Sequence, residues 1–395
     1  MADRLRAIVV GGGIAGLASA VSLAQAGWQA TVLERAPAFG EVGAGLAITG
    51  NGMEALAAIG VDAAIRAAGY QTVPAGFQDL KGRWLLQIPD TRADVRSIIT
   101  IWGIHRQRLH AALLRAAQTH DGVELVTGAE VTAVQPGNAA AEPGTVTWRT
   151  GTGQHASESD LVVAADGVRS TVRAQLFPGV SPRYSGSTSW RAVIPDDNSD
   201  GRLVERWGPG TEFGSLRLSD SEIYWYGYFR HPEGACFDDE LAAARDRFSG
   251  WSERVRAIVA ATTASQLMRH DVYHLPGGLP SYVRGRVVVI GDAAHAAVPT
   301  LGAGASTALE DGVCVGRLIA APVAAGGDLA AALAAFDLAR RPRCRQIARL
   351  SAVVARFGAD LGGGWRQPVR NSLLRVTPAR LVVKTGAPLV RWRAP

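Results

Sequence analysis

The sequence predicts an α/β fold in which a Rossmann-like domain is interrupted by a mixed β-sheet domain and completed by C-terminal helices. Three observations predict it. The chain opens on a strand, a glycine-rich turn and a helix, "AIVVGGGIAGLASAVSLAQAG". From about Ser181 to Tyr273, short aromatic-rich segments alternate with Gly, Pro, Asn and Asp turns. After these, "GRVVVIGDAAHAAVP" returns to a strand–loop–helix pattern, and the remainder is rich in Ala, Leu and Arg.

The first half alternates strands and helices. Residues 6–10 are expected to form a strand, residues 14–26 a helix that Gly27 ends, and residues 29–34 a second strand. An amphipathic helix is expected around residues 52–59. The segment "VPAGFQDLKGRWLLQIP" predicts a hairpin that turns at Lys81–Gly82. Helical periodicity returns in "WGIHRQRLHAALLRAAQTH", and strands are expected from "VELVTGAEVTAVQPG" to "DLVVAADG".

The second half predicts one helix over residues 238–259, a strand at Val287–Ile290 and a helix that begins near Ala305. The chain thus leaves its first domain, builds a sheet domain and returns. The expected division is a discontinuous nucleotide-binding domain of residues 1–72, 99–180 and 277–340, a substrate domain of residues 73–98 and 181–276, and a helical segment of residues 341–395.

Composition narrows the class of protein. A chain of 395 residues, 47% hydrophobic and 19% charged, is long enough for more than one core. No apolar run approaches the ~18–20 residues of a membrane span, and the N-terminus enters a strand without a signal peptide, so a cytoplasmic protein is expected. The three cysteines, Cys236, Cys314 and Cys344, are far apart, which predicts neither a disulfide framework nor a metal site.

The net charge of +6 is concentrated at the C-terminus, where no acidic residue follows Asp360. No nucleic-acid-binding motif accompanies it, so no nucleic-acid partner is expected. A solvated basic face is favoured over two alternatives, an anionic membrane surface and a path for anionic cofactors or substrates. The basic residues are Arg366, Arg370, Arg375, Arg380, Lys384, Arg391 and Arg393.

Gly11, Gly13 and Gly16 satisfy the pattern G-x-G-x-x-G between a strand and a helix. The first allows a tight turn, the second lets the backbone approach a pyrophosphate, and the third lets helix and strand pack closely. The helix N-terminus attracts the anion. Glu34 ends the next strand, 21 positions after Gly13, where an acidic residue binds a ribose. Dinucleotide binding is therefore predicted over a structural turn, with NAD and FAD both open.

A second signal is "GDAAHAAVPTLGAGASTALEDG". Asp292 ends a strand and can accept hydrogen bonds from a sugar-alcohol hydroxyl, while Pro299 stiffens the loop. Gly302 and Gly304 let the backbone lie against a flat ring, and the helix N-terminus near Ala305 would stabilise negative charge on a reduced flavin. The alternative is a glycine-rich junction in which Asp292 only caps a helix.

With these motifs the chain resembles the class A flavoprotein monooxygenases, which have the p-hydroxybenzoate-hydroxylase fold, and most closely their salicylate-hydroxylase-like branch. Besides the two motifs above, the resemblance rests on "EVGAGLAITGNGMEAL", "IHRQRLHAALL", "DLVVAADGVRSTVR" and "FDLARRPRCRQIARLS", and it covers nearly the whole chain. Three separated fingerprints in the right order are far more specific than one glycine motif.

The resemblance implies FAD as cofactor, bound non-covalently, with NADH or NADPH as co-substrate. It places Gly13 and Ala15 at the pyrophosphate, Glu34 at the adenosine ribose, Arg35 near the adenine, Arg106 on the flavin side and Asp292 at the ribityl chain. Gly302 through Ser306 would lie along the isoalloxazine, although many relatives have Gln and Asn where this sequence has Ala303 and Ser306. Asp166, with Gly167 and Arg169, matches a motif that contacts both FAD and NAD(P)H. The full expected cofactor set is Gly11, Gly13, Ala15, Gly16, Glu34, Arg35, Gly45, Arg106, Val131, Asp166, Asp292, Pro299, Gly302, Ala303, Gly304, Ala305 and Ser306.

The implied reaction is a monooxygenation. NAD(P)H reduces the flavin, O2 converts it to a C4a-hydroperoxyflavin, and one oxygen atom passes to an aromatic or polycyclic small molecule by hydroxylation or epoxidation. Two alternatives remain: a reductase or dehydrogenase of the same fold without oxygen insertion, and a non-catalytic flavin-binding protein. The sequence leaves monomer and homodimer open.

Substrate-binding candidates lie in "EIYWYGYFR", where Tyr224, Tyr226 and Tyr228 would share one face of a strand and Trp225 the other. The tyrosines could line an aromatic pocket or simply pack in the sheet. Arg191 is the candidate residue for binding an anionic group of the substrate. The alternative is that it is an ordinary surface arginine. No catalytic base is assigned, because His295 is expected to be a structural polar residue.

Overall fold

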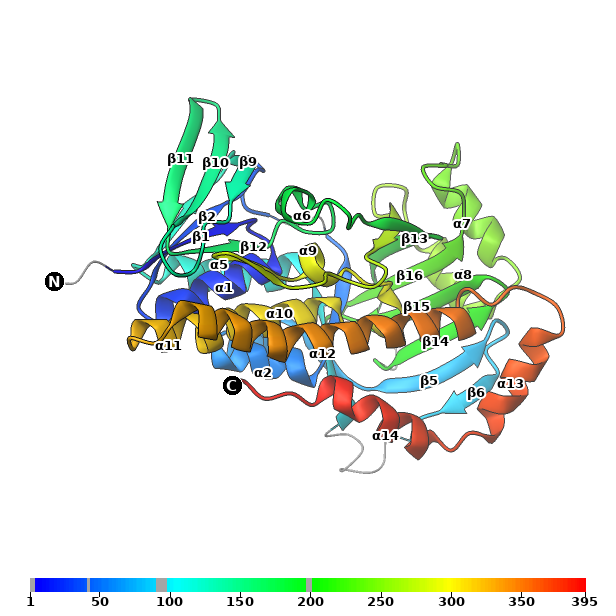
Figure 1. Ribbon diagram of the computed structural model, residues 1–395. Helices are drawn as coiled ribbons and strands as arrows, with labels where there is room; N and C mark the ends of the chain where they lie inside the picture. The colour runs from blue at the N-terminus through cyan, green and yellow to red at the C-terminus, as the bar shows by residue number, and fades with distance from the viewer. Residues whose placement is uncertain (1–3, 41–42, 90–97, 197–200) are drawn as a thin grey trace.

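The chain folds into two β-sheet lobes that are joined by a long helix (Figure 1). This computed structural model describes residues 4–40, 43–89, 98–196 and 201–395. The first lobe contains a six-stranded sheet in the order β18-β19-β12-β1-β2-β8, parallel except for β18. Its strands are β1 (Arg6–Val10), β2 (Gln29–Leu33), β8 (Val123–Val126), β12 (Leu161–Ala164), β18 (Val283–Arg284) and β19 (Val287–Val289).

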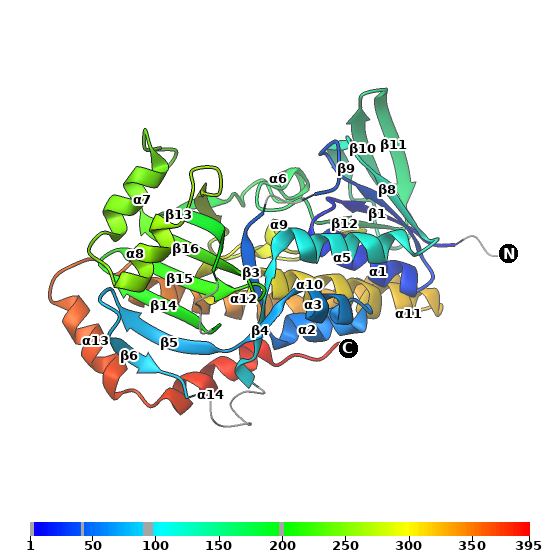
Figure 2. The same cartoon turned by 180° about the vertical axis from the view of Figure 1, so that it is seen from behind.

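The central strands of this sheet are almost wholly apolar because both faces are covered. On one face lies α1 (Ile14–Gln25), flanked by α5 (Arg106–Gln118) and α10 (Gly304–Cys314). A three-stranded antiparallel sheet lies against the other face, as Figures 1 and 2 show. Its strands are β9 (Glu130–Gln135), β10 (Gly144–Thr150) and β11 (Gly153–Ser159).

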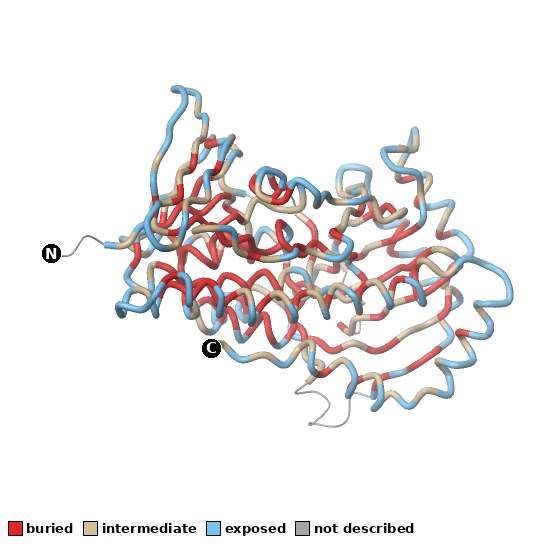
Figure 3. The backbone as a smooth tube through the Cα atoms, in the orientation of Figure 1, coloured by how far each residue is buried: buried red, intermediate tan, exposed pale blue. Residues whose placement is uncertain are grey.

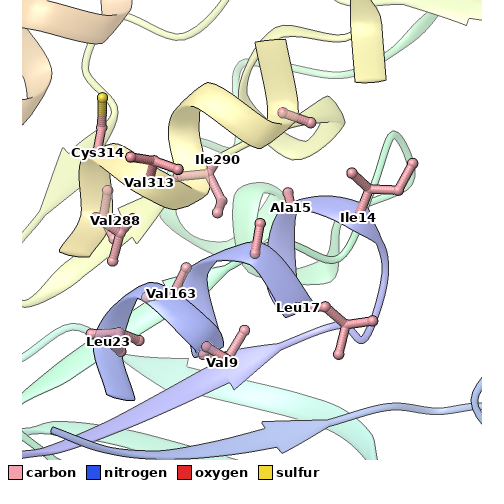
Figure 4. Packing of buried hydrophobic residues seen from close by; sticks show 14 of the residues in the cluster. Val9, Ile14, Ala15, Leu17, Leu23, Val163, Val288, Ile290, Val313 and Cys314 are labelled. Carbon is pink, nitrogen blue, oxygen red and sulfur yellow. The ribbon is translucent and has the colours of Figure 1, made fainter. Parts of the chain in front are cut away.

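Helices α1 and α10 run side by side in the same direction (Figure 4). Glycines permit the contact. A Cβ on Gly312 would lie 2.7 Å from the Cβ of Ala18, and one on Gly316 would lie 1.9 Å from the Oγ of Ser22. At the N-terminal end, Gly291 lies between the two helices: a Cβ on it would lie 3.0 Å from the Ala15 Cβ of α1 and 3.7 Å from the Ala308 Cβ of α10. The positive ends of both helix dipoles therefore meet at one place.

The second lobe is a seven-stranded sheet in the order β17-β13-β16-β15-β14-β5-β6, which is mixed because β14 and β5 are parallel. The predicted hairpin is confirmed as the antiparallel pair β5 and β6. The strands are β5 (Pro74–Asp79), β6 (Trp84–Gln87), β13 (Arg183–Pro195), β14 (Leu203–Gly208), β15 (Thr211–Arg217), β16 (Glu222–Arg230) and β17 (Met268–His274).

The prediction of one continuous helix over residues 238–259 is wrong. The chain forms two helices there, α7 (Glu240–Phe248) and α8 (Glu253–Ala260), which cover one face of the second sheet. The division occurs where Trp251 turns into the core and the backbone N–H of Ser252 donates to the Leu80 carbonyl at 2.7 Å. Long-range packing thus stops a helix that local periodicity would continue.

Shorter elements link the lobes. They are β3 (Gly45–Ile48), β4 (Tyr70–Thr72) and β7 (Ile101–His105), which form a small sheet, with α2 (Gly50–Ala58), α3 (Asp62–Ala68), α6 (Thr171–Leu176), α9 (Asp292–His295) and the 3-10 turn η1 (Pro299–Leu301). Buried residues concentrate in β1, β12, β19, α1 and α10, where Figure 3 is mostly red. This core fixes the loops at its carboxyl edge.

The C-terminal part is helical, as predicted. Helix α10 continues into a π-helical turn η2 (Val315–Ala320) and α11 (Ala321–Ala324), and α12 (Leu329–Phe357), α13 (Arg366–Val376) and α14 (Ala379–Val390) follow. Helix α12 runs without a break through position 340, where the sequence analysis placed the boundary between the nucleotide-binding domain and the C-terminal helical segment. The expected substrate-domain segment 73–98 includes residues 90–97, which lie outside the described residues. Among the residues that are described, no helix is long and apolar enough to cross a membrane.

Candidate active site

Three predicted motifs meet at the carboxyl edge of the first sheet. Strands β1, β12 and β19 are parallel neighbours, so the residues that follow them share one edge. Gly11 follows β1, Asp166 follows β12 and Asp292 follows β19. Ligands of open α/β sheets bind at such an edge.

The glycine turn is too crowded for side chains. Gly11 has φ of +100°, and a Cβ there would lie 2.6 Å from the Ala165 carbonyl oxygen. A Cβ on Gly16 would lie 1.9 Å from the Gly11 carbonyl oxygen. Gly13 caps α1 in an extended conformation, which leaves the first backbone N–H groups of this helix available. These are the features a pyrophosphate site needs.

Glu34 is held at the adjacent strand end. Its two carboxylate oxygens accept from the backbone N–H groups of Gly12, at 2.8 Å, and Ala36, at 2.9 Å. Each oxygen keeps lone pairs for a ribose hydroxyl. The N–H of Ala129 donates to the Glu34 carbonyl at 2.9 Å, so the start of β9, which carries Val131, lies beside this end. Arg35 is exposed next to it.

The predicted flavin half lies at the N-terminus of α10. Gly302 has φ of +60°, and a Cβ on Gly302 or Gly304 would meet no atom within 4 Å. Asp292 and Pro299 are exposed beside this open space, and Ala303 and Ala305 are partly exposed. The loop can therefore present backbone to a flat ring.

Ser306 is turned away from that space. Its buried hydroxyl contacts the Thr49 backbone N–H at 3.1 Å and the Thr49 hydroxyl at 2.9 Å. Gly52 is required here, because a Cβ on it would lie 2.5 Å from the Ser306 Oγ. Ser306 thus fixes the start of α10 against α2, and its side chain is not among the groups that face the loop.

Asp166 is engaged within the protein. Its carboxylate accepts from the Ser170 hydroxyl at 2.5 Å and from the Val172 N–H at 3.1 Å, and so caps α6. Burial raises the pKa of Asp166, against the lowering effect of these bonds. Sequence reasoning missed Arg173, which is buried and donates to the carbonyls of Val168, at 2.6 Å, and Ala293, at 3.0 Å. It ties the Asp166 turn to α9, and no local pattern distinguishes it from a surface arginine.

The three tyrosines share one face of β16, as predicted. Trp225 packs on the opposite face with Phe213 and Phe248 under α7 and α8. The tyrosine face, defined as Arg191, Tyr224, Tyr226 and Tyr228, is turned toward the first lobe. A Cβ on Gly45 would lie 2.3 Å from the Tyr224 Cβ, and Tyr228 packs in a buried cluster with Val298, directly before Pro299.

A positive region lies at one end of this face. Burial, and then the charges of Arg191 and Arg106, lower the pKa of His270. The same two guanidinium groups act on Tyr224, whose pKa burial raises. Arg106, expected on the flavin side, therefore lies between the lobes at the start of α5.

These residues fit FAD, since a crowded glycine turn, a ribose acceptor and an open backbone loop follow one another along a single edge. Comparison with known proteins decides the point: residues 4–351 match a family described as "FAD binding domain". The chain belongs to this family. It is an FAD-dependent, NAD(P)H-using monooxygenase of class A, in the salicylate-hydroxylase-like branch that the motifs predicted.

The similarity to known proteins extends over nearly the whole chain of this flavoprotein. It is 35% identical over 364 residues, 91% of each chain, to the aurachin C monooxygenase/isomerase of Stigmatella aurantiaca. It is 32% identical over 381 residues, 94% of each chain, to a 2-heptyl-3-hydroxy-4(1H)-quinolone synthase of Pseudomonas aeruginosa. Its fold matches that of a Klebsiella pneumoniae HpxO variant complexed with FAD, with a TM-score of 0.86, 24% identity and 98% of each chain covered. The predicted fold class is therefore confirmed.

A buried ionic network supports the cofactor edge of this flavoprotein. The Asp311 carboxylate binds His295 at 2.5 Å, the Arg340 Nε at 2.7 Å and the Gly291 N–H at 2.9 Å. Burial alone would raise the pKa of Asp311, but His295 and Arg340 lower it. Burial opposes protonation of His295, but Cys344 and Asp311 raise its pKa well above the ordinary range. His295 is therefore bound to Asp311 within the buried network, as a structural polar residue would be.

The network continues to the C-terminus through Glu310. This carboxylate binds Arg340 at 2.5 Å, Arg343 at 2.6 Å and the Asn51 amide at 2.6 Å. Arg343 also donates to the carbonyls of Pro388, at 3.2 Å, and Leu389, at 2.9 Å. One network of charged and polar groups thus holds α10, α2, α12 and the end of α14 together.

Two carboxyl groups on the second sheet were not predicted. The Tyr226 hydroxyl lies 3.4 Å from a Glu205 carboxylate oxygen, and the Tyr226 ring packs over Gly214. Burial raises the pKa of Glu205 to about 7. Burial, and then the charge of Glu205, raise the pKa of Glu212 well above its ordinary range. The tyrosine face therefore also carries two carboxyl groups that hold their protons more strongly than an exposed glutamate does.

These acids predict a pH-dependent stability. Because their pKa values are higher in the folded than in the unfolded state, the folded protein binds extra protons above pH ~4.5. The free energy of unfolding should therefore fall as pH rises from ~4.5 through about 7, the folded-state pKa of Glu205. Urea unfolding of the holoenzyme at a series of pH values measures the slope, which should flatten in a Glu205→Gln/Glu212→Gln variant. The exposed Glu54→Gln is the control, and an unchanged slope in the double variant would contradict the assignment.

Proposed function

We propose that this flavoprotein hydroxylates a planar aromatic or polycyclic small molecule bound against the tyrosine face, with NADH or NADPH as electron donor. The proposal rests on the observation that this face points toward the loops of the cofactor edge. Tyr224 packs on Gly45 of the linking strand β3, and Tyr228 belongs to the same buried cluster as Val298 beside the flavin loop, while Trp225 faces the helices. A substrate on this face would therefore lie next to the ring of the cofactor.

The residues have separate tasks. FAD, when bound, supplies the redox chemistry by taking electrons from NAD(P)H and passing one oxygen atom of O2 to the substrate. The turn at Gly11 and Gly13 and the carboxylate of Glu34 would hold its adenosine diphosphate half. The backbone of Gly302–Gly304 would orient the ring. The tyrosine rings provide flat walls that exclude water from the reacting atoms.

We infer that the substrate is a heteroaromatic ring with a carbonyl or phenolic oxygen. Arg191 and Arg106 provide positive charge at one end of the tyrosine face, which suits such an oxygen. Glu205 and Glu212, whose pKa values are raised by burial, lie toward Tyr226 and suit a neutral polar edge better than a second anion. The relative named as a 4(1H)-quinolone synthase supports this class.

The Tyr226 hydroxyl should contribute to substrate binding. In Tyr226→Phe we expect KM for the substrate to rise about fivefold with kcat nearly unchanged, since one hydrogen bond contributes ~1 kcal/mol. Tyr184→Phe is the matched control, because its hydroxyl donates to the His231 carbonyl at 2.6 Å and stays engaged within the sheet. Steady-state kinetics of the two variants measure the difference. Equal KM values in the two variants would show that the Tyr226 hydroxyl does not contact the substrate.

The reaction itself is tested on the purified holoenzyme. NADH and NADPH oxidation would be followed with a panel that includes a 2-alkyl-4-quinolone, salicylate and a hydroxybenzoate, under O2 enriched in heavy oxygen. We expect substrate-stimulated oxidation and a product that carries one heavy oxygen atom. A reduced or dehydrogenated product without the label would show a reductase or dehydrogenase instead, and the absence of any stimulated oxidation would exclude this substrate class.

We further propose that the enzyme acts in the cytoplasm as a monomer or homodimer and has no nucleic-acid partner. Cys236, Cys314 and Cys344 are all free thiols, which suits a reducing compartment where NAD(P)H is also available. The basic C-terminal residues carry no nucleic-acid-binding motif. Sedimentation equilibrium of the holoenzyme distinguishes the two oligomeric states.

A further inference from the structure

The outer surface of the last helices exposes large apolar side chains. Of the nine exposed large hydrophobic residues in the described part of the chain, seven lie between Val353 and Leu381. Trp365, Leu373 and Val376 are 72%, 61% and 77% exposed. The seven are Val353, Phe357, Trp365, Val369, Leu373, Val376 and Leu381. Apolar residues gathered in this way mark an interaction site more often than scattered ones do.

Four of the seven residues form one stripe along α13 and its N-cap residue Trp365. Trp365, Val369, Leu373 and Val376 are spaced by four, four and three positions, so they share a helix face. The opposite side packs on the protein through Arg370, which is buried and donates to the carbonyl of Phe357 at 3.1 Å. This arrangement reverses that of an ordinary surface helix, which turns its apolar stripe inward.

The chain segment that carries this surface is basic. Seven Lys and Arg residues and no acidic residue follow Asp360, and all of the seven except Arg370 are exposed. Arg366 lies over the Trp365 ring at 5.9 Å. Arg375 approaches one carboxylate, that of Asp79, at 4.0 Å. Two copies of this surface would repel each other, so the charge favours an anionic partner.

Both helices are firmly attached to the protein. Val383 of α14 is buried with Leu86 and Ile88 of the second lobe. The end of α14 is bound by Arg343, and Figure 1 shows α13 and α14 along one rim of the molecule. The apolar stripe is therefore presented on a fixed support.

We propose that this C-terminal face, the outer surface of α13 and α14 with its apolar stripe and exposed basic residues, binds the surface of an anionic lipid bilayer. Tryptophan and aliphatic residues that alternate with Lys and Arg suit the boundary between headgroups and acyl chains. No described helix could span the bilayer, so the contact is interfacial and reversible. The sequence favoured a solvated basic face because it showed the charge but not the exposure of the apolar residues. The inference does not depend on the proposed substrate.

The test is co-sedimentation of the FAD-loaded, full-length protein with vesicles. We expect binding to vesicles that contain about one-third phosphatidylglycerol, weak binding to pure phosphatidylcholine, and release by high salt. Arg380→Gln/Lys384→Gln should weaken binding about 25-fold, since each basic residue near such a surface contributes about fivefold. Trp365→Ser/Leu373→Ser should weaken it at least about tenfold.

Control variants remove an exposed apolar residue or two exposed charges elsewhere on the surface. Leu338→Ser removes an exposed leucine of α12, and Arg115→Gln/Arg317→Gln removes two exposed charges on α5 and η2. Both should bind as the wild type does, and FAD content should be unchanged in every variant. The proposal is overturned if the wild type stays unbound at low salt, or if Trp365→Ser/Leu373→Ser binds normally. It is also overturned if that variant instead dissociates a dimer, or if the face binds an acidic protein but no vesicles.

Discussion

Replacing Gly16 with alanine is expected to abolish tight FAD binding. The new Cβ would lie 1.9 Å from the Gly11 carbonyl oxygen and 3.3 Å from the Val9 Cγ1. Gly11 cannot move aside, because its own Cα faces the Ala165 carbonyl of the neighbouring strand end. The strain of ~1–3 kcal/mol must therefore be relieved by opening the turn that receives the pyrophosphate. A loss of ~3 kcal/mol in binding corresponds to about a hundredfold weaker affinity.

The measurement is the flavin absorbance that remains with the protein after gel filtration, together with the equilibrium affinity of the apoprotein for FAD. Gly151→Ala is the control, since a Cβ there would meet nothing within 4 Å. Circular dichroism shows whether Gly16→Ala is folded. If the Gly16→Ala variant is folded and retains as much FAD per protein as the wild type, the glycine turn does not bind the pyrophosphate.

Features that depend on short sequence separations were predictable. The strand–turn–helix at Gly11–Gly16 and the hairpin at Lys81–Gly82 are defined by residue spacing, because turn geometry and side-chain periodicity are local properties. The alternation that places Tyr224 and Trp225 on opposite faces is local too. Parallel pairing then brings Asp292 to the edge that carries Gly11, although the two are far apart in sequence.

Features that depend on distant partners were not predictable. The division between α7 and α8 depends on Trp251 entering a core built from β13, β15 and β16. The raised pKa of Glu212 depends on burial and on Glu205, neither of which a single strand reveals. Arg173 is recognised as structural only when its bond to the Ala293 carbonyl is known. The cofactor roles of the individual site residues remain predictions that the FAD-binding variants test.

Removal of the Arg340 guanidinium should be among the most destabilising single changes. Arg340 is 1% exposed and donates to two fully buried carboxylates, Asp311 at 2.7 Å and Glu310 at 2.5 Å. Arg340→Met keeps most of the side-chain volume but leaves these carboxylates with fewer compensating charges. Loss of one partner from a buried ionic group costs ~3–5 kcal/mol, so the free energy of unfolding should fall by about that amount.

The same change should weaken FAD binding from a distance, which separates Arg340 from residues that contact the cofactor. Asp311 holds the Gly291 N–H directly before Asp292, so a displaced Asp311 shifts the loop at the ribityl end. Arg341→Met is the matched control, because Arg341 pairs with Asp337 at 2.9 Å near the surface, where such a pair contributes ~0–1 kcal/mol. Urea unfolding and FAD titration of both variants test this. If Arg340→Met unfolds at the same urea concentration as Arg341→Met, the network is not what supports the cofactor edge.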